Sequence, residues 1–172
     1  MHTVTLQRRG AFGVLGALMV AGLGGCFRPM LAEGGPASEV RGRIALPPVQ
    51  NRISRVVNDT LENRLGAPQA GETDFRLEVG IRFSERGLLV TQDSDITRVQ
   101  MTAVAEMRLY RNGEVAPVLA DLLSNEAGFD ETASLYASRT ARRDVEERLA
   151  RALAERIALR VLARAERLSA TG

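Results

Sequence analysis

The sequence predicts an α+β fold: a two-layer sandwich in which two helices pack on one face of a roughly four-stranded mixed sheet, in the order β-α-β-β-β-α. Apolar and polar side chains alternate over residues 75–83 and again over 98–109, which indicates two strands. Apolar side chains recur at helical spacing over 53–65 and over 134–168. Because one face of each strand is charged, we expect the helices to cover only the other face.

The first strand is expected over residues 40–46, where apolar or small residues alternate with arginine or alanine. Pro47 and Pro48 would end that strand. The helix over 53–65 ends where Gly66 would supply a C-cap and Pro68 a breaker. A strand–helix–strand unit of this kind predicts two parallel strands joined by a crossover.

The central strands are expected to form a hairpin. Five apolar residues alternate strictly with polar or small ones over 75–83, the most regular strand pattern in the chain. The strand over 98–109 leads into Asn112-Gly113, a hairpin turn signal. The return strand is expected over 115–123, with Pro117 at an edge or a bulge.

The last helix has an apolar seam at steps of four, four, four, four, four and three, made of Val145, Leu149, Leu153, Ile157, Val161, Ala165 and Leu168. Its opposite face carries two acid-first pairs, Asp144–Arg148 and Glu147–Arg151. An arginine stripe flanks the seam near the C-terminal end, where the helix dipole favours cations: Arg156, Arg160, Arg164 and Arg167. Contact with a partner or a phosphate is the alternative role of that stripe.

The N-terminus has the pattern of a cleaved signal peptide over residues 1–25. Arg8 and Arg9 precede a short apolar stretch, which ends in the small residues of Leu23-Gly-Gly-Cys26. That ending resembles a lipobox, so Cys26 is expected to carry a diacylglycerol and an N-acyl chain. An ordinary secretory signal with a chance cysteine is the alternative, and Arg8-Arg9 also hints at twin-arginine export. Residues 26–38 are expected to be a tether, 39–168 a single domain and 169–172 a tail.

Processing would change what the composition implies. Removal of 25 residues from 172 leaves 147, with 21 Arg against 21 Asp plus Glu, so the small positive charge of the whole chain is no argument for nucleic acid. His2, the only histidine, would be lost, and Cys26, the only cysteine, would be lipidated. Catalysis by His or Cys and the usual zinc sites are thereby excluded. The acidic pair Asp93 and Asp95 lies in a polar stretch expected to be a loop.

Several short motifs recur in a defined order over nearly all of the mature chain. They are Cys26-Phe-Arg-Pro29, Arg64-Leu-Gly66, Asp74-Phe-Arg-Leu-Glu-Val79, Ile96-Thr-Arg98, Ala105-Glu-Met-Arg-Leu109, Ser134-Leu-Tyr-Ala137, Ala141-Arg-Arg-Asp144 and Leu153-Ala-Glu-Arg-Ile157. In their order and spacing these motifs resemble the lipopolysaccharide-assembly lipoprotein family, LptE. The stretch 114–130 departs from the pattern of that family.

The resemblance implies a lipid-anchored outer-membrane protein on the periplasmic side, without catalysis, metal or cofactor beyond the covalent lipid. Its partners would be an LptD-like β-barrel, which it plugs, and lipopolysaccharide. Arginine matches lipid A phosphates through forked donors. The candidate contacts are Arg76, Arg82, Arg86, Arg98 and Arg108, although alternating arginines on a solvated strand face are also ordinary solubility chemistry.

Two other functions remain open at this point. One is an accessory lipoprotein of another envelope transport or secretion complex, which would share the anchor and the sandwich. The other, less favoured, is a periplasmic hydrolase, which would need two carboxylates converging in a cleft. Tyr110 and Tyr136 are expected to pack at the edge of the core, and the alternative is that they anchor an interface.

Overall fold

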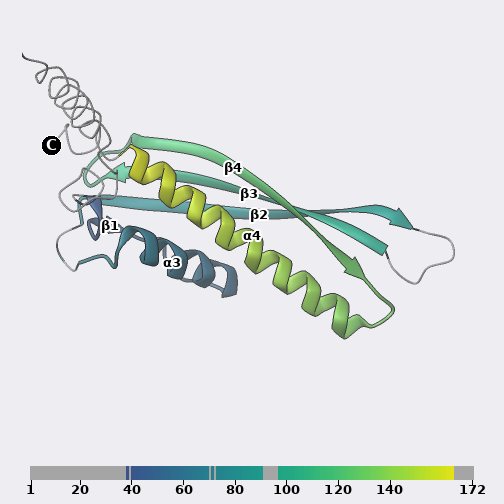
Figure 1. Cartoon of the computed structure of the whole chain (residues 1–172). Helices are drawn as coiled ribbons and strands as arrows, with labels where there is room; N and C mark the ends of the chain where they lie inside the picture. The colour runs from purple at the N-terminus through teal and green to yellow at the C-terminus, as the bar shows by residue number, and fades with distance from the viewer. Residues whose placement is uncertain (1–37, 39, 70, 72, 91–96, 165–172) are drawn as a thin grey trace, which may run out of the picture.

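The computed structural model describes residues 38, 40–69, 71, 73–90 and 97–164, drawn in colour in Figure 1. Several expected features lie outside these residues. They are the signal peptide over 1–25, Cys26 with the tether up to residue 37, the acidic pair Asp93 and Asp95, residues 165–168 of the predicted last helix with Arg167 among them, and the tail over 169–172.

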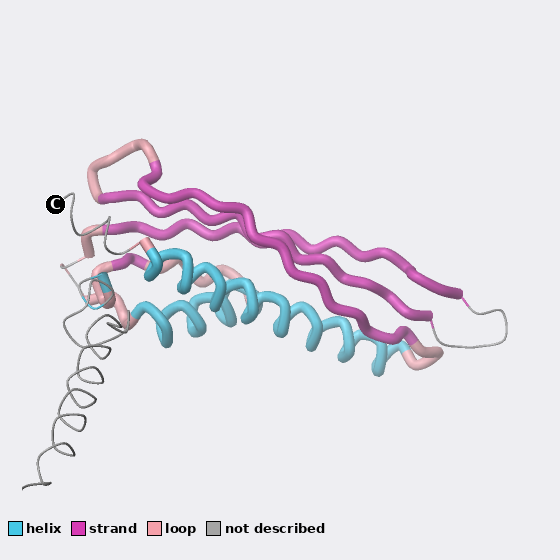
Figure 2. The backbone as a smooth tube through the Cα atoms, turned by 45° about the horizontal axis from the view of Figure 1, so that its top comes forward, coloured by secondary structure: helices cyan, strands magenta, loops and turns pink. Residues whose placement is uncertain are grey.

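The elements follow the predicted order. They are β1 (Ile44–Ala45), α3 (Arg52–Leu65), β2 (Phe75–Val90), β3 (Thr97–Arg111), β4 (Pro117–Glu131) and α4 (Leu135–Ala163). The sheet has the order β1-β2-β3-β4; β1 is parallel to β2, and the other pairs are antiparallel. Both helices lie on the same face of the sheet (Figure 2). The predicted α+β sandwich with a mixed sheet is therefore confirmed.

The first strand is much shorter than the predicted 40–46. Only Ile44 and Ala45 pair with β2, opposite Phe75 and Arg76. Gly42 has a φ of 75°, and its amide donates to the carbonyl of Leu65 at 2.8 Å, so this stretch turns towards the end of α3 instead of extending. Pro47 and Pro48 follow at once, and because proline has no amide hydrogen the pairing does not continue along β2.

The return strand β4 is longer than predicted and runs to Glu131 instead of ending at residue 123. Its inward positions include the half-buried Asp121 and Asn125 between buried Leu119, Leu123 and Phe129, so the apolar series is interrupted. Alternation of apolar residues alone therefore predicts the end of β4 too early. β4 lies at the edge of the sheet and begins at Pro117, and its register against β3 shifts next to this residue. The prediction that Pro117 lies at an edge or a bulge is therefore confirmed.

Helix α3 has a capping motif at each end. The side chain of Asn51 accepts the amide of Ser54, whose own side chain accepts the amide of Asn51, which completes a capping box. At the other end Gly66 has a φ of 85°, a conformation that favours glycine, and confirms the predicted C-cap.

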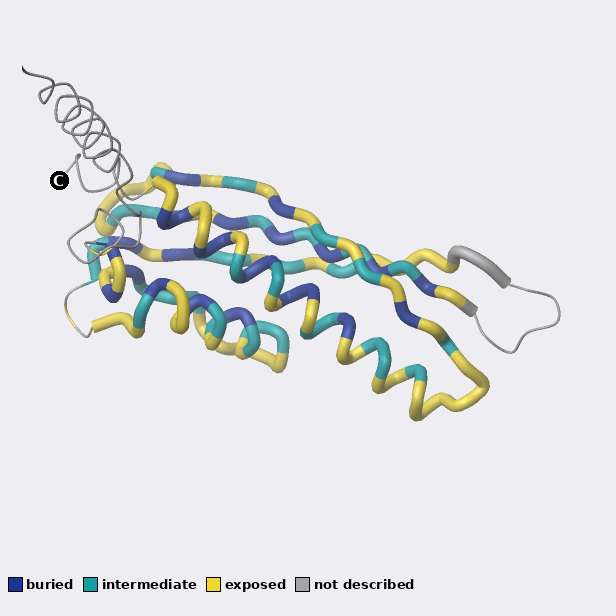
Figure 3. Tube along the Cα trace, viewed as in Figure 1, coloured by how far each residue is buried: buried dark blue, intermediate teal, exposed yellow. Residues whose placement is uncertain are grey.

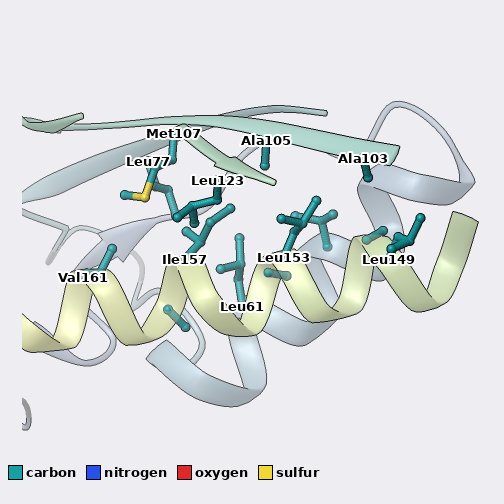
Figure 4. Close-up of a cluster of buried hydrophobic side chains, with 14 of the residues drawn as sticks. Leu61, Leu77, Ala103, Ala105, Met107, Leu123, Leu149, Leu153, Ile157 and Val161 are labelled. Atoms are coloured by element: carbon teal, nitrogen blue, oxygen red, sulfur yellow. The ribbon is translucent and has the colours of Figure 1, made fainter. Parts of the chain in front are cut away.

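Helix α4 buries more than its predicted seam. Val145, Leu149, Leu153, Ile157 and Val161 are all buried, and the seam's last two members lie outside the described residues. A second buried row follows one position later, formed by Ala150, Ala154, Ala158 and Leu162. Small side chains allow close approach, and α4 packs against both α3 and β4. Figure 4 shows the core between α4, α3 and the sheet, and Figure 3 shows buried and exposed positions alternating along the strands.

The two helices are also joined by ion pairs. Arg52 at the start of α3 binds Glu146 and Glu147 of α4, and the hydrogen bond to Glu147 raises the pKa of Arg52. Glu147 therefore contacts Arg52 rather than forming the expected pair with Arg151, whereas Asp144 and Arg148 do pair at 3.7 Å.

Among the described residues, no helix is long and apolar enough to cross a membrane.

Candidate functional site

The face of the sheet opposite the helices is the candidate site, because the five candidate arginines all lie on it. Arg76, Arg82 and Arg86 come from β2, and Arg98 and Arg108 come from β3; all five are exposed. The strand period brings them to this outer face, since residues two apart on a strand share a side of the sheet.

Three of these arginines are neutralised by neighbouring carboxylates. Arg76 pairs with Glu78 and lies over the ring of Tyr110, 4.7 Å from its centroid. Arg108 pairs with Glu106. The side chains of Arg98 and Asp130, on neighbouring strands, approach to 3.4 Å. Such exposed pairs add little stability, but they reduce the positive charge offered to an anion.

Arg82 and Arg86 differ, because within the described part of the chain neither has a carboxylate within ion-pair distance. Arg82 lies opposite Val104 and Arg86 opposite Gln100. At the rise of a β-strand, four residues separate their Cα atoms by about 13 Å. Among the described residues, the outer face therefore presents two guanidinium groups without an ion-pair partner, in a line along β2.

A shallow depression of about 310 Å³ lies beside Arg86, lined also by Ser84, Glu85, Gln100, Thr102 and Glu126. Both of its carboxylates are engaged. Glu126 accepts hydrogen bonds from Gln100 and Thr102, and Glu85 pairs with Arg142 at 3.0 Å. In the described residues no three acidic, histidine or cysteine side chains gather as a metal site would require.

The C-terminal arginine stripe is divided by the structure. Arg156 donates to the backbone carbonyl of Ser124, and Arg160 pairs with Asp121 at 3.3 Å, so both fasten α4 to β4. Arg164 is exposed at the C-cap of α4. The first two therefore act within the fold.

A groove on the inner face was not found by the sequence analysis. Its volume is about 600 Å³, and it lies between β2 and the start of α3. Val79, Ile81 and Phe83 point to the inner face yet are only half-buried, whereas Leu77 on the same strand is 1% exposed. The sequence did indicate such a groove, because the apolar face of the strand over 75–83 is longer than the short helix over 53–65 can cover.

The tyrosines also fall differently from expectation. Tyr110 is half-buried beneath Arg76, as expected for the edge of the core. Tyr136 is 82% exposed, because it lies at the start of α4, ahead of the first buried turn, and its neighbour Leu135 is 73% exposed. The prediction that Tyr136 packs at the core edge is therefore wrong.

The described residues form an α+β sandwich with a charged sheet face that neither of its helices covers, and the same fold occurs in lipoproteins of known structure. A Caulobacter crescentus protein described as a lipoprotein is 21% identical, with a TM-score of 0.57 over 80% of this chain and 97% of that chain. The minor lipoprotein of Acinetobacter baumannii is 12% identical, with a TM-score of 0.51 over 70% of this chain and 88% of that chain. No family profile and no curated protein sequence matches the chain. The chain therefore has a fold found in bacterial lipoproteins.

Proposed function

We propose that this protein is an outer-membrane lipoprotein, anchored through Cys26 on the periplasmic side, that plugs an LptD-like β-barrel and binds lipopolysaccharide during its assembly at the cell surface. The observation that carries the proposal is where the LptE-like motifs fall in the fold. Arg64-Leu-Gly66 closes α3, the motif over 74–79 opens β2, that over 105–109 lies in β3, and that over 153–157 lies in the buried part of α4.

The outer face supports the barrel part of the proposal. A plug needs a rigid body with a polar surface, because the interior of an outer-membrane barrel is itself polar. The core behind the sheet is continuous, and in the described residues no polar or charged side chain is buried. The outer face carries paired arginines and glutamates that remain solvated.

Arg82 and Arg86 are the proposed lipopolysaccharide contacts among the five candidates. Neither side chain forms an ion pair with a carboxylate of the described residues, so both guanidinium groups can bind a phosphate without first breaking such a pair. The interaction should weaken as salt is raised, because exposed charges are screened.

A matched pair of double variants tests these contacts. Arg82→Glu with Arg86→Glu should lower the affinity for purified lipopolysaccharide roughly tenfold, since two exposed charge pairs worth up to about 1 kcal/mol each are lost. The control is Arg139→Glu with Arg143→Glu, which reverses two exposed arginines on α4. Equal losses in the two double variants would show that binding follows net charge and not this face.

Affinity isolation from gently solubilised outer membranes tests the partner. An LptD-like barrel should co-purify with the full-length protein in a stable ratio. Repeated recovery of a different envelope complex would instead favour the accessory role in another transport or secretion system.

A further inference from the structure

Within the described part of the chain, the edge of β2 that faces β1 is unpaired over most of the strand. β1 pairs only with Phe75 and Arg76, and within the described residues no other strand pairs on that side. Pro47 and Pro48 stop β1 from continuing, because neither can donate a ladder hydrogen bond. Figure 1 shows the sheet continuing well beyond the start of α3. A long open edge is a template for another strand unless it is protected.

The amides and carbonyls of every second residue of β2 face this edge. The amide of Phe75 donates to the carbonyl of Arg43, on the β1 side, at 3.2 Å. Amides two residues apart face the same edge of a strand, and no register shift interrupts β2 before Gly87. The amides and carbonyls of Val79, Ile81 and Phe83 therefore face the open edge.

The side chains of these same residues line the groove. Val79, Ile81 and Phe83 form one wall, and Ile53 and Val57 of α3 contribute to the other, in a groove of about 600 Å³. A strand added at the edge would place every second side chain into this groove, against the apolar side chains of β2. The main chain of such a strand would supply affinity, and its alternate side chains would supply specificity.

The charged side chains on the outer face of β2 favour an added strand of one charge. Arg82 and Arg86 lie on the outer face of β2 without a carboxylate partner among the described residues. Outward side chains of an added strand would lie opposite them, where acidic residues form favourable cross-strand pairs. The opposite edge of the sheet differs, since Arg156 of α4 already binds the Ser124 carbonyl of β4.

We propose that the open edge of β2 is a strand-acceptor site for an extended segment of a partner polypeptide in which apolar and acidic residues alternate. The apolar residues enter the groove between β2 and α3, and the acidic residues face Arg82 and Arg86. The site does not rest on the function proposed above. Lipopolysaccharide and the acidic strand would compete for the two arginines, whereas Ile81 belongs to the strand site alone.

The full chain, reconstituted in phospholipid nanodiscs, is tested with two capped nine-residue probes. One alternates valine and glutamate, and the other alternates valine and lysine. The glutamate probe should bind, measured by fluorescence anisotropy, and should slow deuterium exchange of the β2 amides over 77–87. Arg82→Glu with Arg86→Glu should weaken the glutamate probe about tenfold and favour the lysine probe.

The backbone contribution is tested at Ile81, whose amide faces the open edge. Ile81→Pro removes that donor without removing a hydrogen bond to β3, and should abolish probe binding, whereas Ile81→Val should retain it. Lipopolysaccharide affinity should be the same in both variants, which separates this site from the outer face.

Other outcomes would overturn the proposal. If neither probe binds, or if a probe binds without slowing deuterium exchange of the β2 amides, the edge accepts no strand. Concentration-dependent protection of β2 without probe would place a second copy of this chain on the edge. Saturable binding of dodecanoate that excludes the peptide would assign the groove to an acyl chain. An unchanged probe preference in the double arginine variant would remove the acidic occupant.

Discussion

Replacement of Leu153 by alanine tests the assignment of faces on α4. Leu153 is 0% exposed and belongs to the core between α4 and the sheet. The substitution removes three carbon atoms, worth about 2.4 kcal/mol at roughly 0.8 kcal/mol for each buried methylene. The cavity left behind adds to this, so the loss of unfolding free energy should be about 3–5 kcal/mol. That is a large part of the stability of a typical domain.

Leu159 is the matched control, because it is a leucine on the same helix that is 57% exposed. Leu159→Ala should change the unfolding free energy by less than about 1 kcal/mol. Both variants are compared with the parent by urea denaturation of a chain lacking residues 1–26. Similar losses in the two variants would refute the inference that the seam through Leu153 holds the sandwich together.

Four further results are expected. Gly66→Ala should destabilise the domain by about 1–3 kcal/mol in the same assay, because the φ of 85° suits only glycine and a Cβ would approach a backbone nitrogen to 3.1 Å. Gly80→Ala should be neutral or stabilise by up to about 1 kcal/mol, since among the described residues, its two chain neighbours apart, no atom lies within 4 Å of the added Cβ. Arg52→Ala should cost less than about 1 kcal/mol, because its side chain is 40% exposed, and the cost should shrink in high salt. Cys26→Ala should abolish labelling by radioactive palmitate and release the protein from membranes; persistent labelling would place the lipid elsewhere.

The order of the elements was predictable because each strong pattern arises from burial on one side. The strict alternation over 75–83 and the four-residue steps of α4 both reflect a sheet covered by helices on a single face. The errors occur where another interaction replaces that pattern. Gly42 turns towards α3 in place of an extended strand, and β4 tolerates Asp121 at an inward position because Arg160 pairs with it.

The candidate site was predictable only in part. Period-two spacing places the five candidate arginines on one face, but it cannot tell which of them a carboxylate will neutralise. Arg98 is paired across strands with Asp130, a contact that depends on the register between β3 and β4. The groove beside β2 depends on where α3 is placed along the sheet, and although the sequence showed a short helix beside a longer apolar strand face, that placement is set by tertiary packing.

The most direct test of the proposed function is the amount of lipopolysaccharide at the cell surface after depletion of this protein. Surface lipopolysaccharide should fall, the LptD-like barrel should be poorly assembled, and re-expression of the parent chain should restore both. Re-expression of the Arg82→Glu, Arg86→Glu variant should restore the barrel but only part of the lipopolysaccharide. Unchanged surface lipopolysaccharide and a correctly assembled barrel after full depletion would contradict the proposal.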